Sequence, residues 1–111
     1  MSRWQMLDPD KVFQALEDAA EIWVEAQAQH DDLERKGEIL LSQLVVEARA
    51  SGEPATTAKD KARSSEQWKT HCTALTETSR AKNSARAKYD NLKTLAELRR
   101  SQEATARYMT R

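Results

Sequence analysis

Four basic side chains recur at intervals of seven residues near the end of this sequence. They are Arg86, Lys93, Arg100 and Arg107. In an α-helix this spacing places all four on one face, because seven residues make nearly two turns. Phosphate backbones favour such a row through counterion release, without any reading of base sequence. We therefore take this row, together with Arg99 and Arg111, as the candidate nucleic-acid-binding set.

The same row has two simpler interpretations. Asp90 and Glu97 follow Arg86 and Lys93 by four residues, so half of the row can form ion pairs within its own helix. The face would then be solvated and internally paired, or it would dock a protein. Only the terminal part, where Glu103 is the sole acid among the arginines, keeps a clear positive charge.

The sequence contains no recognisable set of catalytic residues. The two histidines, His30 and His71, fall in different predicted helices, and we expect His30 to be a packed polar residue. The sequence has no H-E-x-x-H or C-x-x-C motif, and two glycines are too few for a phosphate-binding loop. We expect a protein that is not an enzyme, with no catalytic residue, metal site, cofactor or small-molecule substrate.

Charge is divided unevenly along the chain. Residues 1–53 carry five Lys/Arg against twelve Asp/Glu, a net charge of −7, and residues 54–111 carry thirteen against six, a net charge of +7. The total of zero therefore hides a strongly dipolar molecule. An acidic helix that clasps a basic one, or a basic arm that binds a polyanion, would each explain this pattern.

Composition predicts an all-α fold in a single helical domain. Only two Gly and two Pro occur, and strong helix formers are abundant. The first helix is expected over residues 9–50, with Asp8 as its cap, a hydrophobic staple between Leu7 and Val12, and a stop at the glycine and proline of residues 51–54. A spacing of four and three runs along it, mostly through apolar or small residues, which is typical of a coiled-coil seam: Val12, Leu16, Ala19, Trp23, Ala26, His30, Leu33, Gly37, Leu40 and Leu44. Gly37 indicates close approach by a neighbouring helix, with a kink as the alternative.

The second half predicts two helices after a loop over 51–56. A short helix over about 57–63 would start at a capping box from Thr57 to Asp60, and a long helix over about 66–107 would follow a break near Ser64 and Ser65. Its looser seam is Trp68, Cys72, Leu75, Thr78, Lys82, Ala85, Tyr89, Leu92 and Ala96.

A short connection between long helices makes them antiparallel neighbours, so we predict a long, coiled-coil-like helical hairpin. With Leu44 placed near Cys72, facing residue numbers add to about 115. Trp23 then lies opposite Leu92, Ala19 opposite Ala96, and His30 near Ala85. The termini would meet, which brings Trp4 and Met6 near Tyr108 and Met109, to pack together, stack on bases or anchor a partner.

One apolar stretch exceeds what a single partner helix can cover. Burial of each large side chain is worth about 1.5–3 kcal/mol, so these side chains are expected to pack against another part of the chain or a second molecule. The short helix is one cover and self-association the other. The expected homo-oligomer interface consists of Ile39, Leu40, Leu41, Leu44, Val45 and Val46.

Cellular context is indicated by what the sequence lacks. Cys72 is the only cysteine and cannot form an internal disulfide, and we expect it to be a small buried residue on an apolar face. No secretory signal is visible, and the apolar runs are far shorter than the roughly 20 residues that span a bilayer. We expect a cytoplasmic protein with no membrane contact.

The last helix resembles a group of small helical proteins encoded by tailed phages and prophages near replication and recombination genes. The matching stretches are Trp68-Lys69-Thr70-His71, Ala85-Arg86-Ala87 and Arg100-Ser101-Gln102-Glu103-Ala104-Thr105-Ala106-Arg107, about 40 of 111 residues. Arg99 stands where relatives carry an aromatic residue. The resemblance implies a non-enzymatic accessory role that involves DNA or a DNA-processing protein. The alternative is an adaptor or inhibitor of a host protein, without nucleic-acid binding.

Overall fold

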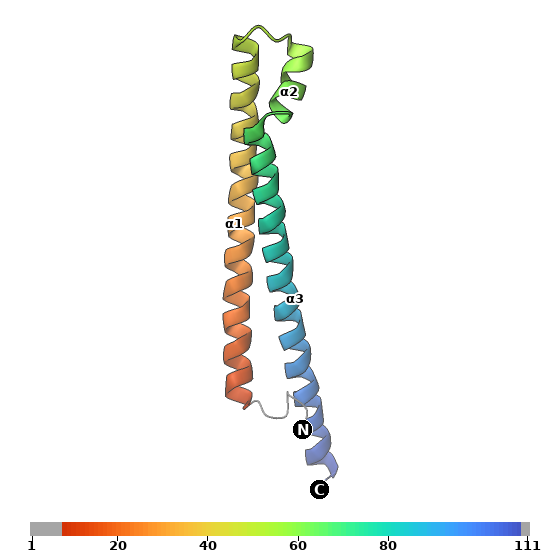
Figure 1. Cartoon of the computed structure of the whole chain (residues 1–111). Coiled ribbons are helices and arrows are strands. Elements are labelled where there is room, and N and C mark those ends of the chain that lie inside the picture. Colours follow the sequence, from red (N-terminus) through yellow and green to blue (C-terminus); the bar gives the residue numbers. More distant parts are fainter. Residues whose placement is uncertain (1–7, 110–111) are drawn as a thin grey trace. The chain divides into compact units, whose positions relative to one another are not determined.

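The computed structural model describes residues 8–109 and consists of three helices joined by short turns. They are α1 (Pro9–Ala50), α2 (Ala55–Arg63) and α3 (Glu66–Met109), as Figure 1 shows. No strand occurs among the described residues. The all-α prediction is confirmed, and the helix ends agree with the expected 9–50, 57–63 and 66–107 to within two residues.

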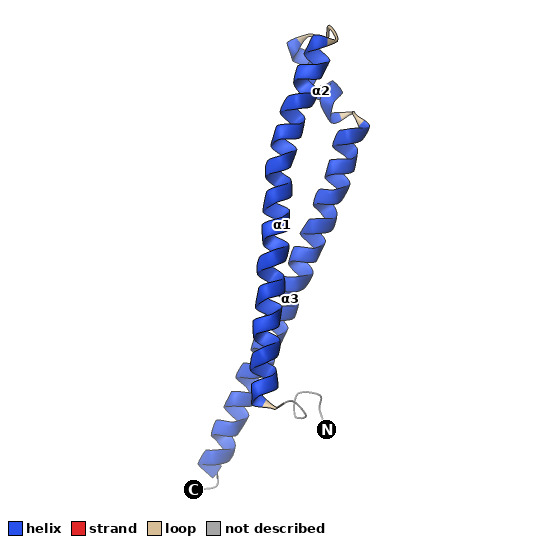
Figure 2. Cartoon of the chain, turned by 90° about the vertical axis from the view of Figure 1, so that its left-hand side faces the viewer, coloured by secondary structure: helices blue, strands red, loops and turns tan. Residues whose placement is uncertain are grey.

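The chain packs as two compact units. Unit 1 holds the start of α1, up to Glu25, and the end of α3, from Asn83; unit 2 runs from Ala26 to Lys82 and includes α2. In each unit the α1 and α3 segments lie side by side and run antiparallel (Figures 1 and 2). The predicted helical hairpin with a short intervening helix is therefore confirmed.

Both ends of α1 follow the sequence signals. The Asp8 carboxylate accepts a hydrogen bond from the Asp10 backbone N–H at 3.2 Å, which caps the helix. At the other end, the N–H groups of Gly52 and Glu53 donate to the carbonyls of Arg49 and Ala48, both at 3.0 Å. This pair of bonds is a Schellman motif, and it needs the positive φ of 100° that Gly52 adopts. The expected staple partner Leu7 lies outside the described residues.

The starts of α2 and α3 differ from each other. The capping box from Thr57 to Asp60 is wrong, because α2 begins at Ala55 with Pro54 as its N-cap residue. Thr57 lies inside the first turn, where its hydroxyl donates to Glu53 Oε2 at 2.8 Å. The break before α3 is confirmed, and Ser65 Oγ accepts the Trp68 N–H at 3.2 Å as its cap.

The seam of α1 is confirmed along its whole length, since all ten predicted positions are buried or half-buried. The seam of α3 is confirmed except at one position. Cys72 is exposed, and its neighbour His71 is buried in its place, so the prediction of a buried thiol is wrong. The spacing from Trp68 is three residues and then four, rather than four and then three.

In unit 2 the predicted register of the two helices is wrong by about one heptad. His30 does not face Ala85 but lies against Thr78, with Nδ1 2.9 Å from Oγ1. Gly37 lies against His71. In both pairs the residue numbers add to 108 rather than about 115. In unit 1, the Trp23 ring packs on Tyr89, with 5.5 Å between ring centroids, where Leu92 was expected.

The reason for the shift is the place that α2 occupies. Ala58 and Ala62 of α2 are 1% and 3% exposed, and Ala62 lines the same pocket as Leu44 and Ala48 of α1. The short helix therefore covers the last two turns of α1. Helix α3 begins beyond it: Gln67 in its first turn lines the same pocket as Leu44, and His71 lies against Gly37.

Candidate nucleic-acid interface

The basic stripe, which we define as Arg86, Lys93, Arg100 and Arg107, lies on one exposed face of α3 in unit 1. The first two members directly follow seam positions: Arg86 follows Ala85, and Lys93 follows Leu92. The successive charges stand about 10 Å apart along the helix, at 1.5 Å per residue. The stripe therefore borders the groove between α3 and α1 while remaining open to solvent.

Part of the stripe is engaged within the chain. Arg86 Nε lies 3.9 Å from an Asp90 carboxylate oxygen, and its guanidinium carbon lies 6.0 Å from the ring centre of Trp23. Both side chains of the Arg86–Asp90 pair are more than half exposed, so the pair contributes little to stability. The internally paired interpretation thus applies to the first member of the stripe.

The other predicted arginines have different environments. Arg99 occupies the seam row, its side chain is only 22% exposed, and its Nε lies 3.3 Å from Glu103 Oε1. Arg107 Nε donates to the backbone carbonyl of Glu103 at 3.4 Å. Lys93 and Arg100 are exposed. Arg111 lies outside the described residues.

The row of α1 that borders the stripe is uncharged. It carries Phe13 and Ala20, which directly follow the seam residues Val12 and Ala19. The nearest acids of α1, Asp10 and Glu17, fall in the next row outward on the helix. The α1 residues in the row next to Lys93 and Arg100 therefore carry no charge of their own.

The last turns of α3 extend past the beginning of α1. Residues 101–109 are all exposed, and Figure 2 shows this end of α3 beyond the start of α1. Tyr108 and Met109, each 79% exposed, lie here. Trp4 and Met6, which were expected to meet them, lie outside the described residues. This end carries Arg107 on exposed turns of α3, whereas Arg100 lies just before them, beside the start of α1.

The histidines of unit 2 are structural. His30 is 7% exposed and contacts two partners, Thr78 and the Glu34 carboxylate, whose Oε1 lies 2.7 Å from Nε2. His71 is 9% exposed and packs between Gly37 and the Trp68 ring. Within residues 8–109, no cluster of three or more His, Cys, Asp or Glu side chains could hold a metal ion.

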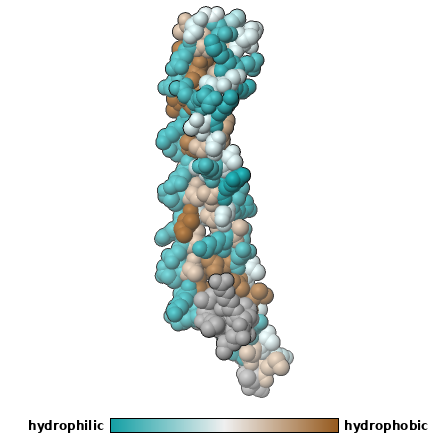
Figure 3. Space-filling view, in the orientation of Figure 1, coloured by the Kyte–Doolittle hydropathy of each residue, from teal (hydrophilic) through white to brown (hydrophobic). Residues whose placement is uncertain are grey.

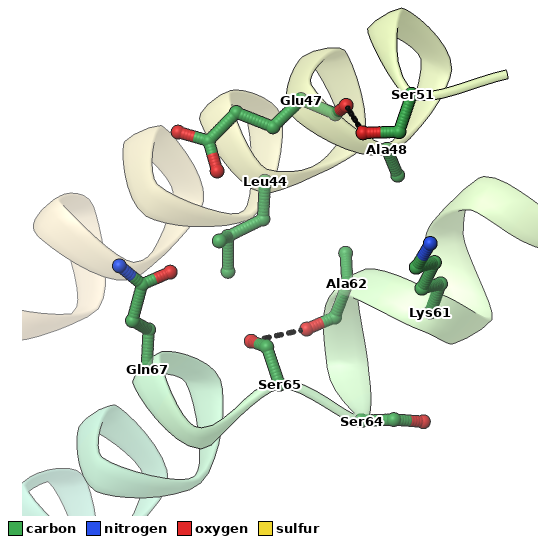
Figure 4. Close-up of a pocket in the computed structure, with 9 residues that line it drawn as sticks. All are labelled: Leu44, Glu47, Ala48, Ser51, Lys61, Ala62, Ser64, Ser65 and Gln67. Atoms are coloured by element: carbon green, nitrogen blue, oxygen red, sulfur yellow. Dashed lines mark hydrogen bonds between the residues drawn. The ribbon is translucent and has the colours of Figure 1, made fainter. Parts of the chain in front are cut away.

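A pocket of about 410 Å³ opens where α1, α2 and α3 meet in unit 2 (Figure 4). Its apolar part comes from Leu44, Ala48 and Ala62, and its rim carries Glu47 and Lys61. Lys61 reaches back to Glu53, with 3.4 Å between Nζ and Oε1. The Thr57 hydroxyl, and then the Lys61 ammonium, hold the pKa of the Glu53 carboxyl below its ordinary value of 4.5. These contacts tie α2 to the end of α1.

The residues of the predicted oligomer interface differ in how far they are buried. Leu44 is 6% exposed under α2, and three residues of the set, Leu40, Leu41 and Val45, are half-buried. Ile39 and Val46 remain 59% and 67% exposed. On the face drawn in Figure 3, hydrophilic side chains predominate and apolar ones form small separate areas. The exposed part of the predicted interface is therefore reduced mainly to two residues.

Comparison with protein-family models, curated proteins and solved structures finds no match for this chain. Among the helices of the described region, none combines the length and the apolar character that a membrane span requires.

Proposed function

We propose that this protein is a non-enzymatic accessory factor that binds nucleic acid through the basic stripe of α3. The resemblance to small phage helical proteins suggests the setting, in which the protein acts near DNA replication or recombination in the host cytoplasm. The observation that carries the proposal is the position of the stripe. Lys93 and Arg100 are exposed, and the row of α1 next to them is uncharged.

Binding of this kind depends on salt. A short stripe neutralises only a few phosphates, so we expect weak binding without base specificity at about 50 mM salt and a steep loss of affinity as salt rises. Fluorescence anisotropy of labelled oligonucleotides during a salt titration measures both quantities. Absence of binding at low salt would exclude the proposal.

A variant in which two basic side chains of the stripe are replaced by uncharged ones tests where nucleic acid binds. Replacement of Lys93 and Arg100 together, as Lys93→Gln and Arg100→Gln, should weaken binding to all sequences alike and reduce the salt slope by about one for each phosphate that is no longer neutralised. The matched control is Lys88→Gln, which removes an exposed charge from a different side of the same helix. An equal effect of the control would place binding outside the stripe.

The second candidate function is a protein–protein adaptor without nucleic-acid binding. It is favoured by Ile39 and Val46, which stay exposed on α1 after α2 has covered Leu44. Capture from nuclease-treated host lysate tests it. A partner that is retained after nuclease treatment and lost with Ile39→Asp would support the adaptor, and loss of the partner on nuclease treatment would favour nucleic acid.

A further inference from the structure

Phe13 is an exposed aromatic residue beside the basic stripe. It is 63% exposed, although its neighbour Val12 on the same helix is 7% exposed. Single exposed apolar residues are common on protein surfaces and mean little alone. Phe13 differs from such single residues because its aromatic ring lies next to both apolar side chains and guanidinium groups.

A small hollow joins Phe13 to the stripe. It has a volume of about 160 Å³ and lies in unit 1, between the start of α1 and the end of α3. Its apolar lining comes from Val12, Leu16 and Ala96, and its polar lining from Arg99, Arg100 and Glu103. Since Arg99 lies 3.3 Å from the Glu103 carboxylate, the negative charge in the hollow is compensated.

The size of the hollow limits the ligand. Pockets for drug-sized molecules have volumes of about 300–1,000 Å³, so this one suits a single flat ring system. A nucleobase has an aromatic face for Phe13 and polar edges for Glu103 and Arg99, and its phosphate would lie toward Arg100. A duplex keeps its bases stacked inside, so only an unpaired base can enter.

We propose that Phe13, together with Arg100, stacks an unpaired base of a single-stranded nucleic acid whose phosphates follow the basic stripe. This inference rests on the proposed function and narrows its ligand to single strands. An acidic peptide would satisfy the charges of Lys93 and Arg100 but would leave the ring of Phe13 without a stacking partner.

The test compares Phe13→Ala with the unchanged protein on three probes: an oligothymidylate of about 16 nucleotides, an abasic oligonucleotide of the same length, and a duplex. Removal of one stacking interaction should lower affinity for the oligothymidylate by roughly 5- to 150-fold. Affinity for the abasic strand and the duplex should stay the same. Phe13→Trp, which keeps an aromatic face, should retain binding to the oligothymidylate.

The controls separate stacking from damage to the fold. Val24→Ala removes another exposed apolar side chain of unit 1, 67% exposed, and should change none of the three affinities. Equal losses on all probes for Phe13→Ala, or no loss on the oligothymidylate, would overturn the inference. Displacement of the oligothymidylate by polyglutamate as effectively as by a second oligothymidylate would also overturn it. Failure of Lys93→Gln and Arg100→Gln to weaken any binding would instead overturn the proposed function.

Discussion

At the scale of single residues, Gly37 and His71 show how one missing side chain sets the contact between two helices. A Cβ on Gly37 would lie 2.8 Å from His71 Cε1 and nearer still to Nε2. Glycine inside a helix costs about 1 kcal/mol relative to alanine. At this position the absence of a side chain leaves room for the imidazole of His71. The close approach that the sequence suggested is therefore confirmed, and its partner is the imidazole of His71.

The effect of replacing Gly37 on stability should change sign when His71 is also replaced. Gly37→Ala should lower the free energy of unfolding, because overpacking costs about 1–3 kcal/mol and the gain in helix propensity only about 1 kcal/mol. In a His71→Ala background the same change should be stabilising, by about 1 kcal/mol. Urea denaturation of the four proteins measures both effects. Equal effects in the two backgrounds would show that the helices do not meet here.

Phe13 is the residue that sequence reasoning missed. Phe13 directly follows the seam residue Val12, so the spacing of the apolar residues places it beside the seam. It has no aromatic residue near it in the sequence. The sequence pattern therefore gave no reason to expect a binding role for it. Its meeting with Arg100 is a contact between the two ends of the sequence, which the linear pattern of a single helix does not show.

At the scale of the elements, α2 depends on the corner that joins it to α1. Glu53 accepts hydrogen bonds from Thr57 at 2.8 Å and from Lys61 at 3.4 Å, and these groups lower the pKa of its carboxyl. A carboxyl with a lowered pKa in the folded state stabilises the fold above its ordinary pKa of 4.5. That contribution is lost as the pH falls through the lowered value.

We therefore expect α2 to open more readily in acid. Amide hydrogen exchange of residues 55–63 should accelerate relative to the middle of α3 as the pH falls below about 4.5, after correction for the intrinsic pH dependence of exchange. Glu53→Gln should give faster exchange at neutral pH and remove most of the acid dependence. If the variant and the unchanged protein respond alike to acid, other carboxyls control the opening.

At the scale of the whole molecule, charge and apolar surface predict different kinds of association. The net charges of −7 and +7 in the two halves of the sequence would attract a second copy in low salt. The exposed Ile39 and Val46 would hold a second copy by apolar contact, which salt does not weaken. We propose a homo-oligomer held mainly by the apolar contact.

Light scattering distinguishes these two causes. The mass should be a multiple of 12.6 kDa at both low and high salt, and Ile39→Asp should reduce it to that of one chain. Val24→Asp, which introduces the same charge at an apolar residue of unit 1 that is 67% exposed against 59% for Ile39, is the matched control. A mass that falls to one chain in high salt would assign the association to charge instead.

The sequence by itself determined the fold class, the two ends of α1, the break before α3 and the face of α1 that is buried. Those features depend on local physics: the hydrogen bonds at Asp8, Gly52 and Ser65, and the periodic spacing of apolar side chains. Each acts over a few residues, so the linear order of residue types is sufficient to read it.

Only the tertiary structure decided the register, the burial of His71 in place of Cys72, and the meeting of Phe13 with Arg100. A heptad pattern is equally satisfied when one helix slides by seven residues, so periodicity cannot choose between registers. The choice is made by α2, whose Ala58 and Ala62 cover the end of α1 and thereby set where α3 begins. The candidate binding site likewise depends on the tertiary structure, because it combines residues from the two ends of the sequence.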